Sequence, residues 1–151
     1  MPNPVQSSNG TIILPVPITG WTLGTETETI DDTDEHISTD ILCESLHEKI
    51  VYITAAEVVV AGVPGPLWCW IELSPYDNDT SAAFWAAIGG GGGAIAPLTP
   101  HIEIATGVNG TIHGIILPWT VHGPYARLVI QTPASVAAAV WAVQAIFGGK
   151  Y

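Results

Sequence analysis

Basic residues are the scarcest class in this sequence. Lysine and arginine number 3 among 151 residues, against 14 aspartates and glutamates, so the formal net charge is −11 at pH 7. Nucleic-acid binding needs basic side chains to neutralise phosphates, and docking on an anionic membrane needs the same groups. The sequence therefore predicts neither a nucleic-acid partner nor a membrane partner.

Cysteine is almost as rare, because the chain has only Cys43 and Cys69. Two cysteines rule out a dense disulfide scaffold, and one bridge remains an alternative if the fold brings them together. We favour two separate buried thiols, which behave as small apolar side chains. No cysteine or histidine pair has the spacing of a zinc site.

Long apolar runs are missing too. No stretch of about 20 apolar residues is free of glycine and proline, so nothing in the sequence predicts a membrane span. Met1-Pro2-Asn3-Pro4 lacks the features of a signal peptide, and we expect a chain made in the cytoplasm. The three Asn-x-Thr sequons, which begin at Asn9, Asn78 and Asn109, are then interpreted as turns and not as glycosylation sites.

Catalytic motifs are also absent. None of the seven serines lies in a Gly-x-Ser-x-Gly elbow, and no Lys-Ser or Lys-Thr follows the glycine run Gly89–Gly93, as a phosphate loop would require. Glu57 and Glu72, expected on neighbouring strands, form the one carboxylate pair of interest. A cross-strand surface pair is the favoured interpretation of these two glutamates. The sequence therefore predicts a protein that is not an enzyme.

The most prominent feature of the sequence is a pair of long apolar stretches that are expected to form strands. Ile50–Ala61 and Leu67–Leu73 are two long apolar stretches, joined by a turn that contains two glycines and two prolines. In the second stretch, Trp68 and Trp70 alternate with smaller apolar residues. A strand with one solvent-exposed side carries polar residues on that side. We therefore expect a second sheet or another copy of the chain to cover the two tryptophans.

Further strands follow from alternation and turn signals. Asn109-Gly110 predicts a hairpin between His101–Thr106 and Thr111–Leu117. Two stretches are compatible with helix or strand, and strand is favoured for both: Ser81–Ile88 and Ala139–Phe147. The other expected strands are Thr11–Val16 and Tyr125–Gln131.

About eight short strands without a clear helix predict an all-β, single-domain antiparallel β-sandwich, with the jelly roll as the favoured type. Residues 1–8 are expected to form an N-terminal arm, and residues 9–151 the sandwich domain. Nine of the fourteen acids lie in an acidic segment, residues 24–48. We interpret this segment as an exposed strand followed by a loop with one short helical turn.

Two loops carry candidate metal ligands. Carboxylate oxygens suit calcium, and they are supplied by Asp31, Asp32, Asp34, Asp77 and Asp79. Neither loop has the EF-hand pattern, so a solvated acidic loop is the favoured interpretation and calcium the alternative. No other cofactor is expected.

Four of the six tryptophans are candidate contact residues for a partner or ligand: Trp68, Trp70, Trp85 and Trp119. In overall character the chain resembles the small β-sandwich subunits of viral particles, such as capsid decoration, fibre and minor capsid proteins. That resemblance implies a structural protein on a virion or particle surface. Its partners would be copies of itself, as a trimer or higher homo-oligomer, and other particle subunits. The alternative is a carbohydrate-binding or adhesive β-sandwich, in which the same tryptophans stack on sugar and an acidic loop binds calcium.

Overall fold

The structure, a computed structural model, describes residues 5–6, 11–14, 27–59, 66–75, 85–88, 102–104, 112–132 and 139–150. Every regular element among these residues is a β-strand, and the strands form two antiparallel sheets. The first sheet contains β1 (Val5–Gln6), β2 (Thr11–Leu14), β3 (Glu28–Ile30), β6 (Glu48–Val59), β10 (Ile112–Trp119) and β12 (Ala139–Lys150). The second contains β4 (His36–Ile37), β5 (Ile41–Leu42), β7 (Leu67–Ser74), β8 (Ala86–Ala87), β9 (Ile102–Ile104) and β11 (Tyr125–Gln131).

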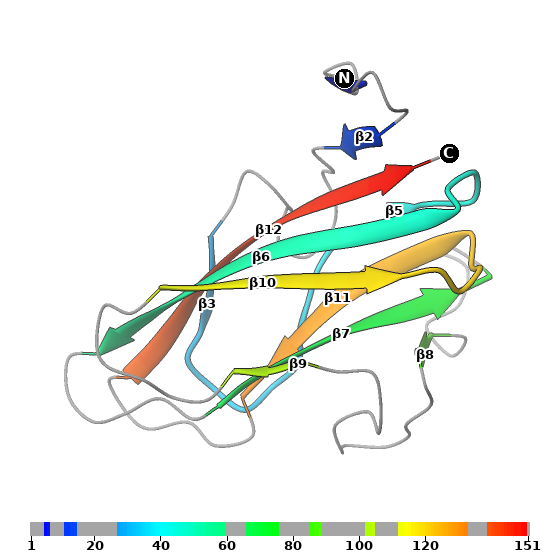
Figure 1. Cartoon of the computed structure of the whole chain (residues 1–151). Helices are drawn as coiled ribbons and strands as arrows, with labels where there is room; N and C mark the ends of the chain where they lie inside the picture. Colours follow the sequence, from blue (N-terminus) through cyan, green and yellow to red (C-terminus); the bar gives the residue numbers. More distant parts are fainter. Residues whose placement is uncertain are drawn as a thin grey trace.

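Several short strands share one position in a sheet. β2 and β3 both pair with β12 along the edge that β6 leaves open. In the same way, β4 and β5 lie end to end beside β11, and β8 and β9 beside β7. The first sheet therefore has five strand positions and the second has four, nine in all. The two sheets pack face to face, which confirms the predicted all-β antiparallel sandwich (Figure 1).

Strand pairing is nested along the chain. The position shared by β2 and β3 pairs with β12, and the position shared by β4 and β5 pairs with β11. Inside these pairs, β6 pairs with β10, and β7 pairs with β8 and β9. Most connections therefore cross from one sheet to the other, so that strands close in sequence lie in opposite layers.

The core lies between the two sheets and is built by alternation. On β6, Val51, Ile53 and Ala55 face inward, and on β12, Trp141 and Phe147 are fully buried. β7 and β11 supply the opposite layer with further buried residues: Leu67, Cys69, Ile71, Ala126, Leu128 and Ile130. Each large apolar side chain buried here contributes about 1.5–3 kcal/mol to the free energy of folding. The interior is therefore a mainly apolar layer, to which four long strands contribute every second residue.

Several strand predictions are confirmed in detail. Tyr125–Gln131 coincides with β11, and the stretch Ala139–Phe147 belongs to β12 and is not a helix. Of Ser81–Ile88, the described part contains the short strand β8.

The two cysteines do not form a disulfide: Cys43 and Cys69 are both buried and unbonded to each other. Burial raises the pKa of the Cys69 thiol to about 12 and that of Cys43 to about 11, so both thiols are protonated at neutral pH.

The predicted hairpin is wrong. β9 pairs with β7 in the second sheet, whereas β10 pairs with β6 in the first. The Asn-Gly signal describes only the local backbone, and it carries no information about which sheet each flanking strand joins. The expectation that Glu57 and Glu72 lie on neighbouring strands is wrong as well, because β6 and β7 follow one another in sequence but lie in different sheets.

The acidic segment agrees with its prediction in part. Its predicted strand contains β3, which pairs with β12. The predicted loop instead contains two further short strands, β4 and β5, which pair with β11, and no described residue of the segment is helical. Of the predicted N-terminal arm, Val5–Gln6 pairs with β2 as β1. Asp77, Asp79 and the glycine run Gly89–Gly93 lie outside the described residues.

A matched pair of leucines on neighbouring strands tests the layered core. Leu128 on β11 is fully buried, whereas Leu42 on β5 is 59% exposed. We expect Leu128→Ala to lower the free energy of unfolding by about 2–5 kcal/mol, because it leaves a cavity between the sheets. Leu42→Ala should change it by about 0.5 kcal/mol or less. Urea unfolding measures both, and equal losses would contradict the assigned strand faces.

Candidate functional site

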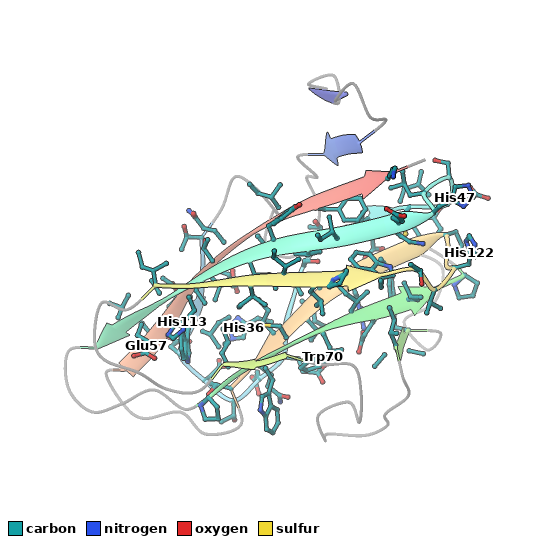
Figure 2. All side chains as sticks on the ribbon, viewed as in Figure 1. His36, His47, Glu57, Trp70, His113 and His122 are labelled. Atoms are coloured by element: carbon teal, nitrogen blue, oxygen red, sulfur yellow. The ribbon has the colours of Figure 1, made fainter. Side chains whose placement is uncertain are left out.

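One histidine lies between two carboxylates where the chain passes from the first sheet to the second. Glu28 lies on β3, His36 lies on β4, and Asp32 belongs to the connection between them. His36 Nδ1 is 2.7 Å from Glu28 Oε1, and His36 Nε2 is 3.1 Å from Asp32 Oδ1. We call residues 31–35 the acidic crossover. The His36 ring, labelled in Figure 2, is largely buried. Because β3 belongs to the first sheet and β4 to the second, the contact between Glu28 and His36 joins the two sheets.

The acidic crossover is held by two further hydrogen bonds. Asp32 Oδ1 accepts a bond of 2.9 Å from the backbone N–H of Asp34. The carbonyl of Thr33 accepts one of 2.9 Å from Nε2 of Gln131, at the end of β11. Asp31 and Asp34 nevertheless remain exposed at the surface.

The geometry favours a protonated His36. Both ring nitrogens face carboxylate oxygens, which only accept hydrogen bonds, and a neutral imidazole has a single N–H to donate. Burial by itself would lower the pKa of His36. The hydrogen bonds and negative charges of Glu28 and Asp32 outweigh that effect, so its pKa is raised. The pKa of Asp32 is lowered in turn, first by the Asp34 N–H and then by His36.

The predicted calcium ligands are brought together only in part. Ligand atoms of Asp31, Asp32 and His36 all lie within 4.8 Å of one another, and Asp34 is not in this group. Calcium takes oxygen ligands, whereas an imidazole nitrogen suits zinc and other transition metals. Any metal here would also have to replace the hydrogen bond between His36 Nε2 and Asp32. The arrangement as it stands is therefore explained by a charged histidine.

We call His36 with Glu28 and Asp32 the charged clamp. It predicts that the stability of the protein depends on pH. The pKa of His36 in the folded state is raised above its ordinary value of about 6.5. Protonated His36 therefore adds its full contribution to the free energy of unfolding at pH values below about 6.5. This contribution is lost as the pH rises through the raised folded pKa. We expect the unfolding free energy of the wild type to fall over this range relative to His36→Gln, by about 1 kcal/mol or less because the ring is partly solvated.

Urea unfolding at several pH values measures the effect. His122→Gln is the matched control, since His122 is exposed and lies with His47 at one end of the sandwich, away from His36 (Figure 2). Parallel stability curves for the wild type and His36→Gln would contradict a charged clamp.

The four candidate tryptophans occupy different environments. Trp119 is 5% exposed and packs in the core, with its ring centroid 5.7 Å from that of Phe147. Trp70 is 2% exposed on the outer side of the second sheet, and its Nε1 donates to Glu72 Oε1 at 3.3 Å. Trp68 and Trp85 are half-buried. Among the four candidates, only Trp68 and Trp85 are therefore accessible enough to contact a partner or ligand.

Trp85 already has an intramolecular partner. The guanidinium of Arg127 lies 4.3 Å from the centroid of its ring, a cation–π geometry. Arg127 also donates from Nε and Nη2 to Glu72 Oε2, at 2.7 and 2.6 Å. Burial first, and then the charge of Glu72, raise the pKa of nearby Glu35, while Arg127 opposes them. Glu72 and Arg127 on the outer side of the second sheet thus satisfy one another.

Glu57 is not the surface residue that the sequence predicted. It is 1% exposed and points between the sheets, whereas Glu72 lies on the outer side of β7. Glu57 Oε1 is 3.6 Å from Nε2 of His113, whose ring is 5.6 Å from that of Trp141. Figure 2 shows Glu57 and His113 together at one end of the sandwich. A buried carboxylate is costly without polar neighbours, and His113 supplies one.

The outer side of the first sheet has a different character. Strand register sets Ile116, Tyr52 and Ile146 side by side across β10, β6 and β12, and they are 56%, 48% and 44% exposed. Ile112 and Val58 extend this apolar surface. We call the part between the strand ends the uncharged face, and it comprises the outward positions Ile50, Tyr52, Thr54, Ala56, Val58, Ile112, Gly114, Ile116, Pro118, Val140, Ala142, Gln144, Ile146 and Gly148. The next outward positions of β6 and β12 are the charged residues Glu48 and Lys150, which bound this face at one end.

Sequence reasoning missed the uncharged face because it followed the tryptophans. A signal was present in β6, where neither Tyr52 nor Val58 nor any position between them on that side carries a charge, in a protein with a net charge of −11. Scattered exposed apolar residues are normal, but a contiguous apolar area across three strands is typical of an interaction surface.

The chain matches no protein-family model, no curated protein and no solved structure. No function therefore passes to it from a relative. Its function is therefore inferred from its contacts, burial and charge. In the part of the chain that the structure describes, no helix has both the length and the apolar character that a bilayer crossing requires.

Proposed function

We propose that this chain is a non-enzymatic structural subunit that associates with copies of itself through the uncharged face, as part of a virion or similar particle surface. The observation that carries the proposal is the row Ile116, Tyr52 and Ile146, which lies open to solvent in the middle of that face. Association would remove this apolar surface from water, which is favourable by about 25 cal/mol per Å².

Charge supports the same surface. A protein with a net charge of −11 repels its copies wherever acidic surfaces meet, and burying unpaired carboxylates costs free energy. The uncharged face avoids both costs. Glu28 and the acidic crossover lie beyond its edge, so they can stay solvated while the sheets of two copies meet.

The strand order supports the particle-subunit interpretation. Beyond β1, the position shared by β2 and β3 pairs with β12, and each inner pair follows in turn; such nested pairing is the arrangement expected of a jelly roll. Jelly rolls occur in viral capsid proteins and also in lectins. The fold class by itself is therefore compatible with the alternative of a carbohydrate-binding or adhesive module.

The tryptophans favour assembly over sugar binding. Sugar recognition by stacking requires an open indole face, but Trp70 and Trp119 are buried and the ring of Trp85 holds the guanidinium of Arg127. Trp68 is half-buried and also has an interaction within the chain. The uncharged face needs no rearrangement before it can contact another copy.

A single charge in the middle of the uncharged face tests the proposal. We expect the wild type to form oligomers at micromolar to millimolar concentrations and Tyr52→Glu to be a monomer, because association would bury an unpaired carboxylate. Sedimentation velocity and native mass spectrometry measure the change. Leu42→Glu places the same charge at an exposed apolar residue of the second sheet and should leave the oligomer intact.

Folding of each variant is checked by circular dichroism and urea unfolding. A wild type that stays monomeric over this range would contradict the proposal. So would a Tyr52→Glu variant that is folded and has the oligomer distribution of the wild type.

A further inference from the structure

A pocket of about 380 Å³ lies at the end of the sandwich where β6 begins and β10 and β12 end. Two of the three basic residues of the whole chain, Lys49 and Lys150, line it. We call it the lysine pocket, and its other lining residues are Glu48, Ile50, Tyr52, Pro118, Trp119, Thr120 and Gly149.

The polar groups around this pocket are mostly donors. Lys49 is 2% exposed, and its Nζ donates to the carbonyl of Val121 at 3.1 Å, which uses one of its three N–H groups. Lys150 Nζ is 3.9 Å from Glu48 Oε2, and both side chains are more than half exposed. Trp119 Nε1 is buried and has no hydrogen-bond partner among the described residues. With two lysines against one glutamate, the lining of the lysine pocket has a net charge of +1 in a strongly acidic chain, which suits a carboxylate-bearing partner.

The same chain displays such a partner at its other end. Four of the five residues of the acidic crossover are acids, and all five are exposed. Strand register places Ile30, which precedes the crossover, beside Trp141 and hence level with Glu57 of β6. Glu57 is eight positions beyond Lys49 on β6, a distance of about 27 Å along the strand.

From this separation we propose that the lysine pocket of one copy receives the acidic crossover of a second copy. The proposal rests on the proposed function, since its partner is another copy of the chain, and it adds a second contact to the uncharged face. Two different surfaces meet in such a head-to-tail contact. Repetition therefore closes a ring or extends a filament, depending on the rotation between copies.

Net repulsion between copies does not prevent this contact. At physiological ionic strength charges are screened over about 8 Å, so the local groups decide whether two surfaces attract. Individual surface ion pairs are weak, at about 0.2–1 kcal/mol. The contact is therefore expected to fix the order and orientation of copies, while the uncharged face supplies most of the affinity.

Charge exchange between the two surfaces tests the proposal. Lys150→Glu reverses the pocket, and Asp34→Lys reverses the crossover without removing the backbone N–H that Asp32 accepts. Each single variant should associate at this contact about tenfold more weakly than the wild type. An equimolar mixture of the two variants, and the double variant, should recover the wild-type size distribution in sedimentation velocity.

A pair of variants with equal charge separates this contact from general repulsion. Lys150→Gln and Leu42→Glu both lower the net charge by one, and only Lys150→Gln touches the pocket. We expect Lys150→Gln to weaken association and Leu42→Glu to leave it unchanged. Equal effects of these two variants, or no recovery in the mixture, would overturn the proposal.

Failure of this inference can be told from failure of the proposed function. Tyr52 lines the pocket as well as the uncharged face, so Ile146→Glu, which lies outside the pocket lining, separates the two surfaces. If Lys150→Glu has no effect but Ile146→Glu abolishes association, the pocket contact is wrong and the uncharged face stands. If neither Ile146→Glu nor Tyr52→Glu has an effect, the proposed function is wrong. A monomeric wild type overturns both.

Discussion

Burial of alternate side chains between two sheets is the constraint on which the rest of this structure depends. Val51, Ile53 and Phe147 of the first sheet pack toward Leu128 and Ile130 of the second, and all are almost wholly excluded from water. Because a strand sends its neighbouring residues to opposite sides, filling this layer also decides which residues face outward. The surface chemistry is therefore the complement of the core, strand by strand.

The outer sides of the two sheets differ in whether their exposed groups contact other groups of the chain. On the second sheet, Arg127 pairs with Glu72 and covers Trp85, so the polar and aromatic groups there are occupied within the chain. The first sheet keeps Tyr52 and its apolar neighbours open and uncharged. Charged groups gather at the two ends instead, acidic at the crossover and basic at the lysine pocket. Such a division suits a subunit that meets its neighbours by a face and by its ends.

Buried polar groups follow the same logic of local compensation. Ser38 is almost inaccessible, and its hydroxyl donates to the carbonyl of Thr39 and accepts from the N–H of Leu128. Lys49 reaches the carbonyl of Val121, and Glu57 lies beside His113. Each buried polar group costs free energy unless its bonding capacity is used. These residues therefore connect strands and loops that are far apart in sequence.

Local pattern determined which segments are strands and which of their sides is buried, because alternation and β-propensity act over a few neighbouring residues. Tyr125–Gln131 shows this, since its limits and its inward residues were predictable. Pairing was not predictable: β9 and β10 join different sheets, Glu57 turns inward, and Glu28 meets His36 across the two layers. The uncharged face and the lysine pocket likewise exist only once β6, β10 and β12 lie side by side. Partners distant in sequence are selected by the burial of the whole sandwich, and so only the tertiary structure decided them.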